Sequence, residues 1–171
     1  MSLVVEKLTH TNFPKFEKKL LQSLKEEYKA TYNLILDDTQ SKQLIDYCIS
    51  YMYVLVLKIS TSSKMLGYFS ISRTDLNKTK SFVKHIINYT LGYVFVFDVY
   101  VFPKYRRKGI GTYLVRQAVC TTVKDFQAKR IFLYIQSSEL SSFYNRNGFS
   151  YKASVKFADN NSLLLLENNL Q

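Results

Sequence analysis

The sequence predicts a single mixed α/β domain that spans residues 1–171. Apolar residues recur at helical spacing in some segments and at strand spacing in others, and the two kinds of segment alternate along the chain. The length lies in the range of roughly 100 to 200 residues that is usual for one domain. Hydrophobic residues make up 47% and charged residues 22%, which is typical of a folded protein and excludes a disordered chain.

The first part of the chain predicts a strand, two helices and a hairpin. The strand covers residues 3–8 and ends at the polar residues 9–12, which have the composition of a helix cap. The first helix carries apolar residues three and four positions apart, namely Phe13, Phe16, Leu20, Leu21, Leu24 and Tyr28. The second helix begins at about Thr39, and its inward-facing residues are Leu44, Ile45, Cys48 and Ile49. Strands over 52–59 and 66–71 form the hairpin, and the Lys-rich residues 75–84 form a loop.

The most apolar segment predicts a central strand. Residues 92–102 are apolar at both the odd-numbered and the even-numbered positions, which is typical of a strand covered on both faces, and Pro103 ends this strand. A basic loop, residues 104–111, then leads into a helix that ends at about Phe126. The expected apolar face of this helix consists of Ile110, Leu114, Val115, Ala118, Val119 and Val123. Strands over 130–135, 149–156 and 162–167 and a short helix over 140–146 complete the prediction.

The charge of the chain is strongly positive and unevenly distributed. The 24 Lys and Arg residues exceed the 13 Asp and Glu residues, so the formal net charge is +11. Residues 1–60 hold eight basic and seven acidic residues, so ten of the eleven surplus charges follow residue 60. This asymmetry indicates an anionic partner, whether nucleic acid, a phosphorylated cofactor or an acidic membrane. The alternative is a basic surface that serves only solubility.

Cysteines and apolar runs indicate no metal site, disulfide or membrane segment. Cys48 and Cys120 lie in apolar contexts without the close spacing of zinc or redox sites, so we expect buried thiols. The first residues lack the basic and apolar regions of a signal peptide. The longest apolar run, residues 93–101, is too short for a membrane span and contains Asp98. We expect a cytoplasmic or nuclear protein without a membrane partner.

The loop between the central strand and its helix has the features of a phosphate site. The first N–H groups of a helix are unpaired, and the positive end of the helix dipole attracts anions. Gly109 and Gly111 tolerate positive φ and allow a ligand to approach the backbone closely. Four cations adjoin the glycines, namely Lys104, Arg106, Arg107 and Lys108. A pyrophosphate would fit here, although an ordinary basic turn has the same composition, and the P-loop and dinucleotide-binding glycine patterns are absent.

Two motifs and the element order resemble a known family. Residues 106–111 read Arg-Arg-Lys-Gly-Ile-Gly, which matches the R/Q-x-x-G-x-G/A motif of the GNAT superfamily of acetyl-coenzyme A dependent N-acetyltransferases, and residues 99–103 match the preceding strand. Residues 142–149 read Ser-Phe-Tyr-Asn-Arg-Asn-Gly-Phe and resemble that family's F-Y-x-x-x-G-F segment. The element order is similar over essentially the whole chain. The resemblance implies a central splayed mixed sheet flanked by helices.

The resemblance also implies a binding site for acetyl-coenzyme A. Backbone N–H groups from Arg107 to Thr112 would bind the pyrophosphate, and the main chain of 99–101 would pair with the pantetheine arm like an added strand. The basic side chains would meet the 3′-phosphate. Ser137 stands where the family often has Asn, and its hydroxyl would keep one hydrogen bond to the cofactor arm. The implied cofactor-binding residues are Val99, Tyr100, Val101, Arg106, Arg107, Lys108, Gly109, Ile110, Gly111, Thr112 and Ser137.

By the same resemblance, an amine would attack the thioester directly in a ternary complex. Tyr144 would protonate the leaving thiolate as a general acid, because a phenol stays protonated at neutral pH; packing alone is the alternative. Asp98 would orient or deprotonate the amine, although a structural Asp bonded to its neighbours explains it equally well. Glu139 is a weaker candidate for the base, and no metal takes part.

Two other functions remain open at this point. A non-catalytic acyl-coenzyme A binding or regulatory module would keep the glycine loop without needing Tyr144. A nucleic-acid binding module would use Lys78, Lys80, Lys84 and residues 106–108, but no known nucleic-acid motif supports it. The acceptor amine is not identified, although an acidic pocket around Asp37, Asp38 or Asp98 would attract a cation. The apolar residues 163–166 suggest a possible homodimer.

Overall fold

The computed structural model describes residues 2–62, 64–72, 92–135, 138–156 and 162–170. Its contacts divide the chain into two compact units. The first contains residues 1–70 and 98–114, and the second contains residues 71–97 and 115–171. The predicted loop over 75–84 and Ser137 lie outside the described residues.

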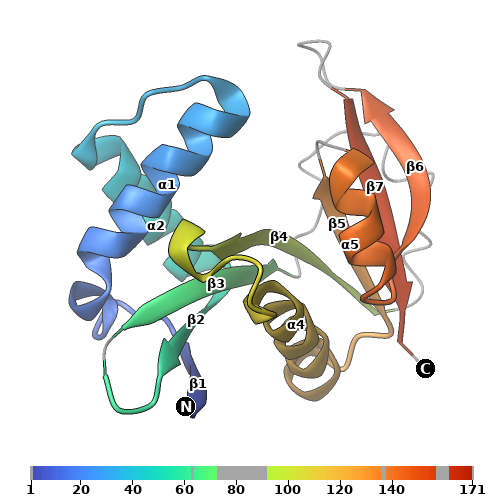
Figure 1. Ribbon diagram of the computed structural model, residues 1–171, viewed down its shortest axis with the longest axis horizontal. Coiled ribbons are helices and arrows are strands. Elements are labelled where there is room, and N and C mark those ends of the chain that lie inside the picture. The colour runs from blue at the N-terminus through green and yellow to red at the C-terminus, as the bar shows by residue number, and fades with distance from the viewer. Residues whose placement is uncertain (1, 63, 73–91, 136–137, 157–161, 171) are drawn as a thin grey trace. The chain divides into compact units, whose positions relative to one another are not determined.

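Among the described residues, seven strands form a sheet in the order β1-β2-β3-β4-β5-β7-β6 (Figure 1). β4 and β5 pair in parallel, whereas β1–β2, β5–β7 and β6–β7 pair antiparallel. The predicted mixed α/β class is therefore confirmed. The strands are β1 (Leu3–Lys7), β2 (Tyr53–Ile59), β3 (Met65–Ser72), β4 (Tyr93–Val101), β5 (Arg130–Ile135), β6 (Ser150–Lys156) and β7 (Ser162–Asn169).

The helices follow the prediction closely, with one difference at the first. They are α1 (Glu17–Tyr32), α2 (Asp38–Tyr51), α4 (Ile110–Phe126) and α5 (Ser141–Asn145), with 3₁₀ turns η1 (Phe13–Lys15), η3 (Pro103–Tyr105) and η4 (Ser138–Leu140). The predicted cap at residues 9–12 is wrong, because α1 begins later, after η1. The Asn12 side chain instead accepts the Thr9 N–H at 2.7 Å and donates to the Lys7 carbonyl at 2.8 Å, which closes a turn.

In the first unit, α1 and α2 pack on one face of strands β1 to β3 (Figure 1). The core combines Phe16 and Leu20 of α1 and Ile45 of α2 with side chains of the strands. The strand side chains in this core are Val54, Val56, Met65, Tyr68 and Tyr100. The helical spacing of the apolar residues therefore indicated the buried faces of α1 and α2 correctly.

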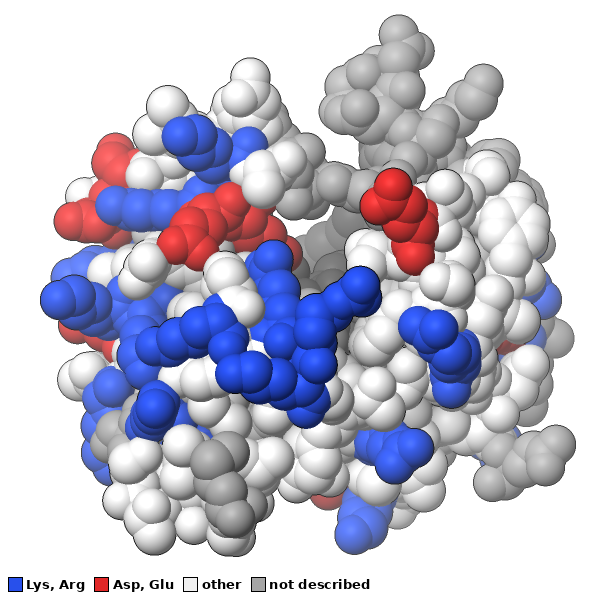
Figure 2. All heavy atoms as spheres, in the orientation of Figure 1, with Lys and Arg blue, Asp and Glu red and all other residues white. Residues whose placement is uncertain are grey.

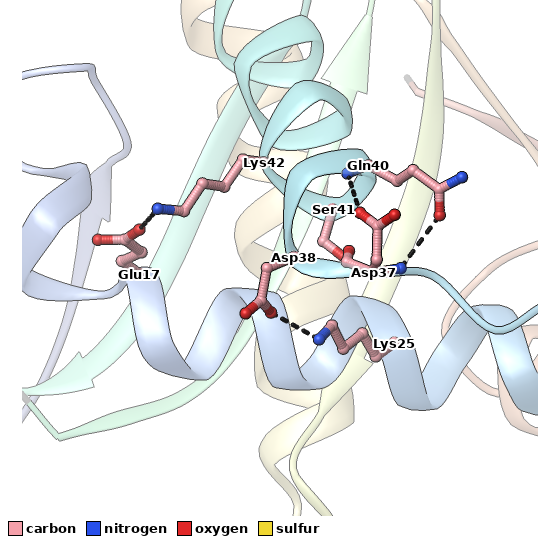
Figure 3. Close-up of polar contacts among 7 residues, drawn as sticks. All are labelled: Glu17, Lys25, Asp37, Asp38, Gln40, Ser41 and Lys42. Carbon is pink, nitrogen blue, oxygen red and sulfur yellow. Dashed lines mark hydrogen bonds and ion pairs between the residues drawn. The ribbon is translucent and has the colours of Figure 1, made fainter.

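Polar contacts cap the start of α2 and join its first residues to α1 (Figure 3). Asp37 caps α2: its carboxylate accepts the Gln40 N–H at 2.8 Å, while the Gln40 side chain accepts the Asp37 N–H at 3.0 Å. Asp38 pairs with Lys25 at 2.6 Å, and Lys42 pairs with Glu17 at 2.7 Å. Asp37 and Asp38 thus serve the helix start and an ion pair, which corrects the expectation of an acidic pocket around them.

In the second unit, one stripe of α4 is buried, and it differs from the predicted one. Val115 and Ala118 are buried as expected, but the stripe continues through Thr122, which has no exposed area, whereas Val123 is 49% exposed. Spacings of three and four residues place 115, 118 and 122 on one face. Cys120 lies off this face and is exposed, so the prediction of a buried thiol there is wrong, while Cys48 is half-buried.

Strand β7 lies between β5 and β6 and is hydrogen-bonded to both. Leu165 and Leu166 are fully buried within this unit. These two leucines are therefore already covered by the chain itself, which removes their apolar surface as a reason to expect a dimer.

The same strand carries a buried carboxylate that the sequence did not single out. Glu167 is 4% exposed and lies 3.0 Å from Arg130 Nε and 3.1 Å from Lys152 Nζ. The strands β5 and β6 supply these two cations from either side of β7. A buried charge is tolerated when it is paired in this way.

Gly67 of β3 allows this strand to approach β4 closely. A Cβ atom on Gly67 would overlap the Tyr100 carbonyl oxygen and lie 2.9 Å from Leu114 Cδ1. We expect Gly67→Ala to lower the free energy of unfolding by about 1–3 kcal/mol, since overpacking forces the backbone to shift. Denaturant unfolding measures the change, with Gly92→Ala as the control because its Cβ would meet its nearest atoms at 3.6 Å. Equal stability of the two variants would contradict the steric argument.

Candidate functional site

The end of β4 delivers the chain into a tight basic turn. Pro103 ends the strand as predicted, and η3 follows with the Tyr105 N–H donating to the Phe102 carbonyl at 2.8 Å. The Arg106 N–H then donates to the Pro103 carbonyl at 3.1 Å. α4 begins four residues later at Ile110. We call residues 104–111 the β4–α4 loop.

Two residues of the β4–α4 loop have positive φ. Gly109 has φ 76° and Arg107 has φ 61°, whereas Gly111 is absent from the described positive-φ residues and lies inside α4. Gly109 thus adopts the positive φ that glycine tolerates, whereas Gly111 has an ordinary helical place in α4. A Cβ atom on Gly109 would meet no atom within 4 Å, so the backbone there faces open space. A ligand can therefore approach the loop backbone at Gly109.

The first turn of α4 exposes backbone donors. The Tyr113 N–H donates to the Gly109 carbonyl at 3.0 Å. The N–H groups of Ile110, Gly111 and Thr112 precede this bond, and none of them meets a backbone carbonyl of the described residues. Unpaired N–H groups at a helix start, together with the helix dipole, favour an anion.

Basic side chains surround these donors. Figure 2 shows Lys and Arg side chains gathered over the segment between β4 and α4, where Lys104, Arg106, Arg107 and Lys108 are all exposed. Arg106 already makes contacts within the protein. Its Nε donates to the Val101 carbonyl at 2.9 Å, and its guanidinium lies 5.7 Å from the Tyr100 ring centroid. Such a cluster of cations strengthens the attraction for a polyphosphate.

The residues of β4 predicted to bind the cofactor arm lead directly into this loop. Val99 and Val101 are half-buried, and Tyr100 is 8% exposed. Asp98 belongs to β4 by its backbone, but its side chain lies outside the described part of the structure. Its predicted role therefore stays a prediction.

Tyr100 takes part in a contact that the sequence did not reveal. Its hydroxyl donates to Glu26 of α1 at 2.9 Å, and Tyr68 of β3 donates to the neighbouring Glu27 at 3.1 Å. The two tyrosine rings stack with their centroids 5.5 Å apart. Burial, and then the hydrogen bond to Glu26, raise the pKa of Tyr100 to about 12. Two adjacent carboxylates are thus held by two stacked phenols.

The raised pKa predicts how Tyr100 responds to alkali. Because the pKa of Tyr100 in the folded state lies above the ordinary tyrosine value of 10.0, its stabilising contribution is complete below pH 10 and is lost as the pH rises through about 12. Absorbance titration of the wild type and Tyr100→Phe gives the ionisation of this phenol by difference, with circular dichroism confirming that both stay folded. A difference curve with its midpoint at the ordinary tyrosine pKa would refute the assignment.

Tyr144, the predicted general acid, lies on α5 in the second unit. Its side chain is 8% exposed, and its ring makes edge contacts with Phe143 and Phe149 at centroid distances of 4.9 Å and 5.8 Å. The Phe149 N–H donates to the Tyr144 carbonyl at 3.1 Å, and Gly148 has φ 88°. The segment following Tyr144 is therefore a tight turn that requires glycine. Glu139 lies in η4 and is exposed.

A family model matches most of the chain. The model described as the acetyltransferase (GNAT) family matches residues 18–149, which include β4, the β4–α4 loop and Tyr144. The chain belongs to the GNAT acetyltransferase family. The sequence resemblance and the fold expected from it are thus confirmed.

Solved structures show the same fold. A ribosomal-protein-alanine N-acetyltransferase from Brucella melitensis is 17% identical, with a TM-score of 0.68 over 98% of this chain and 99% of its own. A chimeric spermidine N-acetyltransferase from Vibrio cholerae is 13% identical, with a TM-score of 0.69 over 99% and 96%. A GNAT acetyltransferase from Staphylococcus aureus is 16% identical, with a TM-score of 0.65 over 99% and 100%. No curated protein sequence matches the GNAT chain.

The helices of the chain differ from membrane-spanning helices. Among the residues that the structure describes, no helix combines the length and the apolar character needed to cross a bilayer.

Proposed function

We propose that the chain is a single-domain N-acetyltransferase that transfers the acetyl group of acetyl-coenzyme A to a primary amine. One observation carries the proposal: a buried strand leads through an open, basic, glycine-containing loop to three backbone N–H groups that meet no carbonyl of the described residues. These donors and the surrounding cations suit the pyrophosphate of coenzyme A. Membership of the GNAT family supports the same cofactor.

Different residues would bind different parts of coenzyme A. N–H groups from Arg107 to Thr112 hold the pyrophosphate, and the Arg107 and Lys108 side chains reach the 3′-phosphate. Arg106 orients the end of β4, because its Nε already contacts the Val101 carbonyl. A carbonyl oxygen has two lone pairs, so Val101 can still accept a bond from the pantetheine arm beside Val99 and Tyr100. Ser137 would add one hydrogen bond to that arm.

Transfer would proceed by direct attack in a ternary complex. The acceptor ammonium loses one proton, and its neutral nitrogen attacks the acetyl carbonyl carbon. The new C–N bond forms as the C–S bond breaks, and the second proton that the nitrogen loses restores the Tyr144 hydroxyl after it has protonated the thiolate. Asp98 is proposed to orient the amine or take its proton, directly or through water. A backbone N–H of residues 99–101 stabilises the oxyanion, and the Tyr144 hydroxyl protonates the departing thiolate. The products are the N-acetyl amide and free coenzyme A.

A thiol-release assay tests the proposal. Purified protein is incubated with acetyl-coenzyme A and a panel of amines, and free coenzyme A and the acetylated amine are both quantified. At least one amine is expected to accelerate thiol release above the rate without amine, with one acetyl group gained per thiol. Tight cofactor binding without transfer to any amine would instead indicate a non-catalytic acyl-coenzyme A binding module.

A further inference from the structure

An open groove of about 720 Å³ runs along α1 beside the first turn of α2, within the first unit. We call it the α1 groove. Six charged residues line it, namely Glu17, Lys18, Lys25, Glu26, Asp38 and Lys42. The three acidic and three basic side chains balance in number, so the groove as a whole attracts neither cations nor anions strongly.

Pairing removes four of these charges. Glu17 binds Lys42 at 2.7 Å and Asp38 binds Lys25 at 2.6 Å, as the facing side chains in Figure 3 show. Lys18 and Glu26 form no ion pair with any residue that the structure describes. The α1 groove therefore offers one positive and one negative group to a ligand.

Glu26 is fixed in place by neutral donors. Gln22 Nε2 donates to its Oε1 at 2.9 Å, and the Tyr100 hydroxyl donates to its Oε2 at 2.9 Å. Neither donor cancels the charge of the carboxylate, and each oxygen keeps a second lone pair for a ligand. Glu26 remains exposed, so an ammonium group can reach it from solvent. The negative end of the α1 groove thus lies beside Tyr100, near the end of β4.

Lys18 is the positive group of the α1 groove. It precedes Glu26 by eight residues on the same helix, which corresponds to about 12 Å along the axis. An extended peptide advances about 3.3 Å per residue, so a peptide whose first residue lies at Glu26 reaches Lys18 with a side chain about three or four residues later. The two unpaired charges are therefore spaced for a peptide rather than for a single amino acid.

We propose that the α1 groove binds a peptide acceptor, with its amino terminus at Glu26 and an acidic side chain at Lys18. This inference rests on the proposed function, which places the thioester beside residues 99–101. The net charge of +11 agrees with it, since long-range attraction favours an acidic chain over a polycation. A polyamine would bring a second ammonium group toward Lys18, where it is repelled.

A charge exchange tests the inference. Peptides that differ only by Glu or Lys at the fourth residue are compared as acceptors, and the wild type is expected to favour Glu by about five- to tenfold in kcat/KM. Lys18→Glu should reverse the preference, and Lys18→Ala should reduce it to the small remainder that the net charge of the protein supplies. Lys124→Glu on α4 changes the net charge equally and should retain the wild-type preference. A glutamate at position 18 suits the first turn of α1, so the fold should persist.

Binding measurements separate this inference from the proposed function. Fluorescence anisotropy of the two peptides on the coenzyme A-loaded protein needs no turnover, and Glu26→Gln should weaken both peptides several-fold while leaving cofactor affinity unchanged. Selective binding without acetylation would overturn the proposed function and support the groove. Three outcomes would overturn the groove assignment. The first is acetylation with no reversal of the preference in Lys18→Glu, and the second is the same reversal in Lys124→Glu. The third is a higher kcat/KM for spermidine than for the acidic peptide.

Discussion

Tyr144→Phe is expected to lower kcat by about 10²- to 10⁴-fold while leaving the affinity for coenzyme A nearly unchanged. The substitution removes only the hydroxyl that is proposed to protonate the leaving thiolate. The ring, whose edge contacts with Phe143 and Phe149 are apolar, keeps its packing. Steady-state kinetics at saturating acetyl-coenzyme A gives kcat, and calorimetric titration with coenzyme A gives the dissociation constant.

Tyr151→Phe is the matched control for Tyr144→Phe. Tyr151 lies on β6, is 60% exposed, and shares a hydrogen bond of 3.1 Å with Ser154 at the surface. Loss of its hydroxyl should leave kcat at the wild-type value. If Tyr144→Phe turns over as fast as this control, the phenol is not the general acid.

Gly111→Glu is expected to weaken coenzyme A binding by at least about tenfold. The new carboxylate enters the first turn of α4, among the N–H groups proposed to hold the pyrophosphate, and repels its negative charges. The helix itself should persist, because an acidic residue in the first turn is favourable to the helix dipole. Calorimetric titration measures the affinity, and the unfolding temperature checks the fold.

Gly92→Glu adds the same charge at an exposed glycine outside the β4–α4 loop. It separates a local effect at the phosphate site from the change in net charge, and its coenzyme A affinity should stay close to that of the wild type. Wild-type affinity in Gly111→Glu, or an equal loss in Gly92→Glu, would remove the β4–α4 loop as the phosphate site.

Local patterns predicted most of the elements that carry the candidate site. Residues 92–102 are apolar at both parities, and Val94, Phe95 and Val96 are buried as this pattern requires. Pro103 and Gly109 marked the end of β4 and the turn before α4, because proline lacks an N–H and glycine accepts positive φ. These signals depend on neighbours within one or two turns, so they can be read from a single sequence.

Contacts between distant segments could not be read in this way. Tyr100 and Glu26 are 74 residues apart, and their hydrogen bond exists only because β4 lies against α1 in the fold. Gly67 gave no turn signal, since its role is to admit the Tyr100 carbonyl from the neighbouring strand. Glu167 likewise owes its two cations to strands on either side of β7. The exposed Val123 is a further example of what a single sequence does not determine. Periodicity identifies an apolar face of a helix, but which residues at the margin of that face are buried depends on the elements that pack against it.

Sequence alone was therefore sufficient for the order of helices and strands, the basic glycine loop and the family motifs, all of which are encoded in short contiguous segments. The tertiary structure decided which charges are already paired within the protein and which remain available. Asp37 and Asp38 looked like a possible cation site, yet one caps α2 and the other binds Lys25. Glu26, in contrast, forms no ion pair with any residue of the described segments. Electrostatic recognition depends on distances across the fold, and spacing along the chain does not determine those distances.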